Sequence, residues 1–89
     1  MPQPQNEIIH QSILAMQKAL QAIQVKAENP QLMIDAEIKL KELMKQLKEE
    51  ENSAIPQVQQ QIQQTEQQIE AMLYELNHQL HQQQRLWFK

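Results

Sequence analysis

The fold of this chain is decided by the stretch around Pro30, residues 23–40, which reads IQVKAENPQLMIDAEIKL. The residue before a proline rarely adopts helical backbone angles, whereas proline itself suits the first turn of a helix. If the apolar spacing before this point continued through Pro30, Glu37 and Lys41 would fall in the core. The sequence therefore predicts a turn at Asn29-Pro30, where one helix ends and another begins.

Apolar residues recur at heptad spacing on both sides of this turn and again in the last third of the chain. We expect helices over residues 6–28, 30–51 and 55–86, preceded by an extended segment at residues 1–5. Ser53 is the expected N-cap of the third helix. The positions expected to be buried are Ile9, Ile13, Met16, Leu20, Ile23 and Ala27 in the first helix; Met33, Ala36, Leu40, Leu43 and Leu47 in the second; and Ile55, Val58, Ile62, Thr65, Ile69, Leu73, Leu76 and Leu80 in the third. The predicted fold is all-α, an elongated antiparallel three-helix bundle or coiled coil whose third helix is longest and overhangs the others.

The composition narrows the classes of function. The 89 residues, at formal net charge -3, predict a single helical domain over residues 1–89, and 20 of them are glutamines. Without glycine and cysteine, the chain has no phosphate-binding loop, disulfide framework, thiolate zinc site or thiol nucleophile. No stretch reads as a signal peptide or a membrane span, so we expect a cytoplasmic protein.

The apolar content also bears on assembly. The chain has 26 isoleucine, leucine, valine and methionine residues in total. Their burial in a lone chain of this length leaves little margin over the conformational entropy lost on folding. We therefore expect a homo-oligomer, first of all a homodimer.

The C-terminal end carries the residues that we expect to contact a partner or a second copy. Tryptophan and arginine are enriched where binding energy concentrates, and two of the three aromatic residues lie here side by side. Two isoleucines of the second helix lie outside its heptad seam and are added to these contact residues, with packing against the third helix as their alternative role. The predicted contact residues are Leu80, Leu86, Trp87, Phe88, Ile34 and Ile38. Docking of the C-terminus onto its own bundle and anchoring at a membrane surface are the alternatives for this end.

A basic stripe suggests a second kind of partner. Three lysines form the stripe along the second helix, and an arginine and a lysine near the C-terminus are added to them. The possible nucleic-acid contacts are Lys41, Lys45, Lys48, Arg85 and Lys89. Neighbouring glutamates and the acidic net charge weaken this interpretation, because nucleic-acid binders usually carry a basic excess.

Histidines and glutamates could in principle hold a metal ion, as in helical di-iron proteins. The candidates are Glu7 with His10, Glu75 with His78, and His78 with His81. The heptad frame directs the first two pairs to the flanks, and a histidine pair on one exposed helix would bind a metal only weakly, so we expect no metal and no cofactor. No spacing unites Ser12, Ser53 and Asp35 with a histidine, so we also expect no catalytic set and no small-molecule substrate. The preferred function is a non-enzymatic helical protein-protein interaction module, such as an adaptor, an assembly factor or a chaperone-like protein. The alternative is a nucleic-acid-associated accessory protein that uses the basic stripe.

Overall fold

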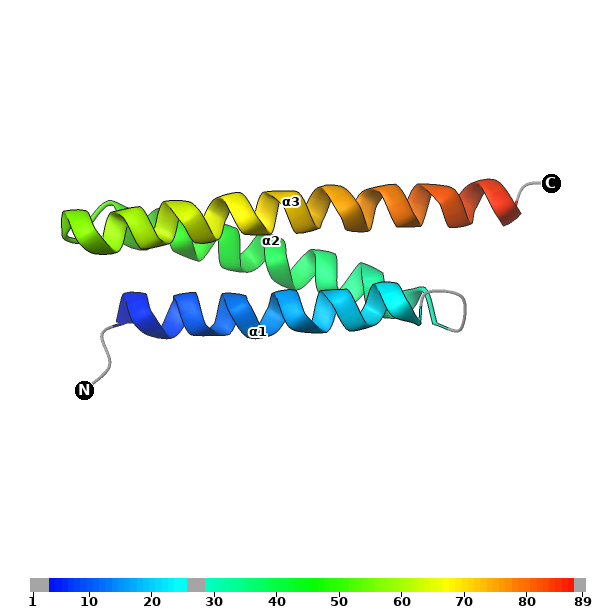
Figure 1. Cartoon of the computed structure of the whole chain (residues 1–89), viewed down its shortest axis with the longest axis horizontal. Coiled ribbons are helices and arrows are strands. Elements are labelled where there is room, and N and C mark those ends of the chain that lie inside the picture. The colour runs from blue at the N-terminus through cyan, green and yellow to red at the C-terminus, as the bar shows by residue number, and fades with distance from the viewer. Residues whose placement is uncertain (1–3, 26–28, 88–89) are drawn as a thin grey trace.

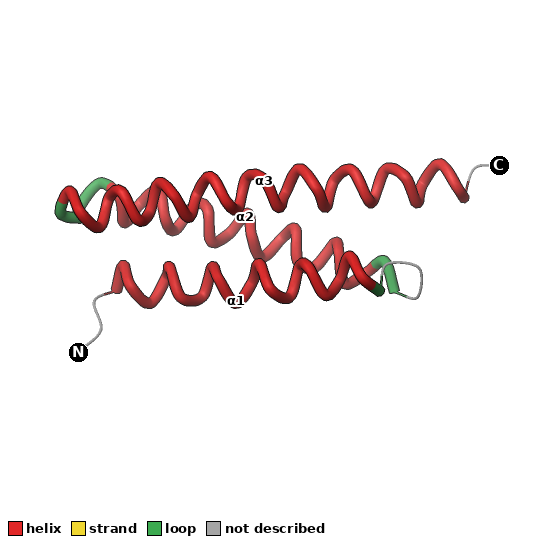
Figure 2. The backbone as a smooth tube through the Cα atoms, viewed as in Figure 1, coloured by secondary structure: helices red, strands yellow, loops and turns green. Residues whose placement is uncertain are grey.

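Within the residues that the structure describes, the chain forms three helices that run up, down and up along one long axis (Figure 1). The computed structural model describes the backbone of residues 4–25 and 29–87, and the side chains of residues 7–25 and 29–81. The helices are α1 (Pro4–Gln24), α2 (Gln31–Glu51) and α3 (Pro56–Trp87). Every pair of helices is in contact, and short connections join them (Figure 2). The predicted all-α, antiparallel three-helix arrangement is confirmed.

The molecule is elongated because α3 is much longer than the other helices. With 32 residues, against 21 in each of α1 and α2, α3 is about 48 Å long. The molecule measures 51 × 20 × 15 Å. Its radius of gyration is 14.7 Å, whereas a compact chain of this length would have about 12 Å. The C-terminal end of α3 extends past the end of α1, as predicted (Figure 1).

The helix ends differ from the predicted ones by a few residues. The prediction of an extended segment over residues 1–5 is wrong for Pro4 and Gln5, which belong to α1. Proline at the start of a helix costs no hydrogen bond, since the first amide groups have no partner within the helix. Residues 26–28 of the predicted first helix lie outside the described residues.

The turn between α2 and α3 corrects the role of Ser53. Its hydroxyl donates a hydrogen bond to the Glu50 carbonyl at 3.3 Å, so it closes the end of α2 and does not cap α3. The amide of Ala54 and the side-chain amide of Gln59 donate to the Glu51 carbonyl at 3.4 and 2.9 Å. These bonds satisfy carbonyl groups that the end of a helix leaves without partners.

The predicted core of α2 and α3 is largely confirmed. Met33, Leu40, Leu43 and Leu47 of α2 are fully buried, and Ala36 is half-buried. On α3 the buried residues are Ile62, Thr65, Ile69 and Leu76, while Val58, Leu73 and Leu80 are partly buried against them. The prediction is wrong for Ile55, which precedes α3 and is 58% exposed.

The predicted buried face of α1 is wrong, because the buried positions lie one residue earlier in the chain than the predicted ones. The residues it buries are small and are spaced three and four apart: Ser12, Ala15, Ala19 and Ala22. Ile13 and Leu20 of the predicted seam are 44% and 51% exposed, and Ala27 lies outside the described residues. Ile9, Met16 and Ile23 are only partly buried, at the edge of the core.

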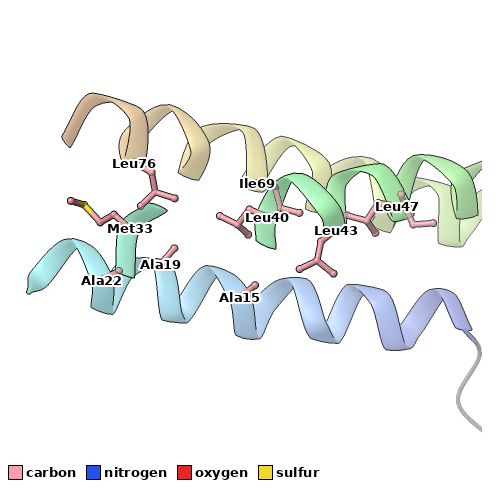
Figure 3. Packing of buried hydrophobic residues seen from close by; sticks show 10 residues of the cluster. Ala15, Ala19, Ala22, Met33, Leu40, Leu43, Leu47, Ile69 and Leu76 are labelled. Carbon is pink, nitrogen blue, oxygen red and sulfur yellow. The ribbon is translucent and has the colours of Figure 1, made fainter. Parts of the chain in front are cut away.

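The physical reason for this rotation is the close approach of α1 to two helices at once. Figure 3 shows Ala15, Ala19 and Ala22 directed from α1 toward the buried side chains of α2 and α3. Alanine at these positions lets the neighbouring helix backbones come near without a clash. The buried hydroxyl of Ser12 is satisfied by the Ile8 carbonyl at 2.8 Å, so its burial leaves no unpaired donor.

Candidate protein interaction surface

A hollow of about 800 Å³ runs along the outside of the α1–α2 pair. We call it the α1–α2 groove. Its lining residues are Gln11, Leu14, Ala15, Lys18, Gln21, Ala22 and Val25 from the first helix and the residue just after it, and Leu32, Asp35, Ala36 and Lys39 from α2. None of them comes from α3, so the groove lies on the side of the α1–α2 pair that α3 does not cover.

The groove has a small, buried floor and large, exposed apolar walls. Ala15, Ala22 and Ala36 form the floor, and the first two are also part of the core. Three large apolar side chains stand beside this floor and are substantially exposed: Leu14 at 44%, Val25 at 37% and Leu32 at 43%. The hollow therefore follows directly from the alanines that bring α1 close to α2, because their methyl groups leave the outer side of the contact unfilled.

The rim of the groove carries charges of both signs. Lys18 and Lys39 are exposed and, among the described residues, form no ion pair. Asp35 accepts a hydrogen bond from the Gln31 side-chain amide at 3.0 Å. The rim thus has two cations and one anion around an apolar floor.

The predicted contact residues Ile34 and Ile38 lie elsewhere on α2. They are 40% and 55% exposed and do not line the α1–α2 groove. On the α3 side of α2, a smaller hollow of about 310 Å³ is lined by Glu37, Lys41, Leu73, Tyr74 and Asn77, with Tyr74 75% exposed. Exposed apolar side chains are therefore present on both flanks of α2.

The predicted C-terminal contact residues are only partly within the described structure. Leu80 is half-buried and packs against the core, so it belongs to the bundle as well as to the predicted contact surface. The backbone of Leu86 and Trp87 continues α3, but their side chains, like that of Arg85, lie outside the described residues. Phe88 and Lys89 lie outside them altogether.

The basic stripe lies on α2 with all three lysines exposed. Lys41 is engaged, because its ammonium group pairs with Glu37 at 3.2 Å. The positive charge of Lys48 acts on Glu66 and favours its ionised form. Lys45 is exposed, with no ion pair among the described residues.

Two carboxyl groups meet where α2 packs on the first half of α3, a feature that the sequence analysis missed. Burial, a hydrogen bond with Glu51 and the negative charge of Glu51 raise the pKa of Glu66 from 4.5 to about 7. Of the two Glu66 carboxyl oxygens, Oε2 is buried and receives no hydrogen bond from an N–H or O–H donor of the described residues. The Gln63 side-chain amide donates to Glu51 Oε2 at 3.3 Å. Glu66 stands out in the sequence only as the single acid within the glutamine-rich residues 57–68.

Nothing in the described residues assembles a metal site or a membrane span. No three histidine, cysteine, aspartate or glutamate side chains of this part of the chain gather closely enough to hold a metal ion. None of the described helices combines the length and apolar character that a membrane crossing requires. Comparisons with family models, with curated proteins and with solved structures find no match for this chain.

Proposed function

We propose that this chain is a non-enzymatic, cytoplasmic protein-protein interaction module of the adaptor, assembly-factor or chaperone-like kind, and that it receives an α-helical partner in the α1–α2 groove. The observation that carries this proposal is the groove itself, an apolar hollow of about 800 Å³ to which, among the described residues, α3 contributes no lining side chain. Leu14, Val25 and Leu32 remain in contact with water there at a cost in free energy. A contiguous apolar surface with a polar rim is typical of an interaction site.

The shape of the groove favours a helix as the occupant. Two antiparallel helices form its sides, and a further helix laid along them completes the packing of a helical bundle. In this mode of recognition an amphipathic helix places its apolar face into a hydrophobic groove, with anchors spaced three and four residues apart. The glutamine and lysine side chains of the rim would contact the polar flanks of that helix.

Neighbouring residues of α1 provide a matched test of this proposal. Leu14 lines the groove and Ile13 does not, yet both are 44% exposed. Tagged wild-type, L14E and I13E chains are isolated from the natural host, and the associated proteins, including untagged copies of the chain, are identified by mass spectrometry. The expected result is a set of proteins retained by wild type and by I13E and lost from L14E. If no retained protein depends on Leu14, the proposal is wrong.

The alternative function, a nucleic-acid-associated accessory protein, is supported by the exposed lysines at positions 41, 45 and 48 of α2. It ranks second because Glu37 already pairs with Lys41 and the chain has net charge -3. Binding to DNA or RNA that weakens steeply as salt rises, and that is lost in a K45E/K48E variant, would favour this alternative.

A further inference from the structure

We propose that the helical partner of the α1–α2 groove is the α1–α2 pair of a second copy, so that each pair lays its helices against the groove of the other and the two pairs stack face to face in a two-fold symmetric dimer. This inference rests on the proposed function and specifies the partner. It also moves the dimer contact from the predicted residues Ile34 and Ile38 to the opposite flank of α2. Self-complementarity in shape and in charge supports it.

The groove combines large and small apolar side chains. In a two-fold interface the same patch faces itself, so the patch must supply both the protrusions and the hollows. The groove does so, because Leu14, Val25 and Leu32 are large and exposed whereas Ala15 and Ala22 leave a depression beside them. Facing layers pack best when large residues of one lie over small residues of the other. Two copies of this groove meet that condition.

The rim carries both positive and negative side chains. A rim of one sign would repel its own copy, but this rim carries Lys18, Lys39 and Asp35. Asp35 accepts the Gln31 hydrogen bond through Oδ1, and its Oδ2 forms no hydrogen bond or ion pair among the described residues. A lysine of the facing copy can pair with this carboxylate, and the pairing occurs twice by symmetry.

The decisive experiment makes the rim carry a single sign of charge. In D35K all three rim charges are positive, and in K18E/K39E all three are negative. The three side chains are exposed, so the bundle is expected to keep its helical content, which circular dichroism verifies. The matched controls are E49K, which changes an exposed acid of α2 outside the groove, and I13E, which changes α1 outside the groove.

The full-length chains are compared by light scattering and by sedimentation equilibrium. Wild type, E49K and I13E are expected at twice the chain mass of 10.6 kDa at tens of micromolar. D35K and K18E/K39E are each expected to dissociate at least about ten times more readily, because like charges then face each other. An equimolar mixture of the two variants is expected to regain the dimer mass, since a positive rim then faces a negative one.

Two results would overturn the inference in different ways. Wild-type chain at the monomer mass excludes the second copy as occupant, while the proposed function still stands if another host protein depends on Leu14. A wild-type dimer that neither D35K, K18E/K39E nor L14E weakens shows that the copies associate through another surface. If Leu14-dependent capture then also fails, the groove has no role as an interaction site and both proposals are wrong.

Discussion

Replacing Ala19 with leucine tests how α1 packs against the rest of the bundle. Ala19 is 0% exposed and lies in the middle of the stripe of small residues that faces α2 and α3. A leucine there has no free volume to enter, so it must push α1 away or adopt a strained rotamer, at about 1–3 kcal/mol. A domain of this length has about 5–13 kcal/mol of stability in total. The melting temperature should fall by about 4–8 °C for each kcal/mol lost.

The neighbouring substitution Leu20→Ala is the control. If α1 instead buried the face predicted from the sequence, Leu20 would be in the core and Ala19 would be exposed. Leu20 is 51% exposed, so its truncation should cost less than about 1 kcal/mol. Urea denaturation followed by circular dichroism, at one fixed protein concentration, gives both free energies of unfolding. The reasoning is refuted if Leu20→Ala destabilises the chain by more than Ala19→Leu, since α1 would then bury its large residues.

Three further substitutions test other parts of the structure. Leu43→Ala removes a side chain that is 0% exposed, and calorimetry should show a loss of about 2–5 kcal/mol; a loss below about 1 kcal/mol would contradict its place in the core. Lys41→Ala breaks the exposed pair with Glu37, and the change in unfolding free energy should stay within about 0.5 kcal/mol. The raised pKa of Glu66 means that the folded chain binds more protons than the unfolded chain between about pH 4.5 and 7, so this group's stabilising contribution is lost as the pH rises through that window. Glu66→Gln should therefore raise stability above pH 7, by about 1 kcal/mol after allowance for solvent screening, with no gain near pH 4.5; an equal effect at both pH values would contradict the assignment.

The sequence was sufficient to predict the helices and the cores of α2 and α3 because each depends on signals along the chain. Pro30 and Pro56 lie at the starts of α2 and α3, and three of the four leucines of α2 (Leu40, Leu43 and Leu47) fall on one buried face together with Met33. The heptad pattern then determines which side of each helix is buried.

The face of α1 could not be assigned by the same rule, because this helix offers two frames. One frame consists of large residues such as Ile13 and Leu20, and the other, one position earlier, consists of Ser12 and three alanines. The larger apolar side chains favour the first frame, since their burial removes more apolar surface from water. Contact with two helices at once favours the second, because small side chains permit close approach to both. The α1–α2 groove was missed for the same reason, since it is a consequence of the alanine frame.

The Glu51–Glu66 pair could not be predicted because it depends on how the end of α2 lies against α3. The two residues are separated by the interhelix turn, and nothing in their spacing indicates contact. The two side chains come together because residues 52–55 turn the chain back on itself. The Gln59 side-chain amide donates to the Glu51 carbonyl across this turn.

The central claim, that the α1–α2 groove is filled by its own copy, is tested most directly by cross-linking between chains. The sequence has no cysteine, so a single one can be introduced at will. Gln21→Cys places it on the groove, and Gln60→Cys places it on an exposed site of α3 outside the groove. With a short bifunctional thiol reagent, we expect covalent dimers of the Gln21→Cys chain and few of the Gln60→Cys chain. Equal yields, or dimers of the Gln60→Cys chain alone, would contradict the claim.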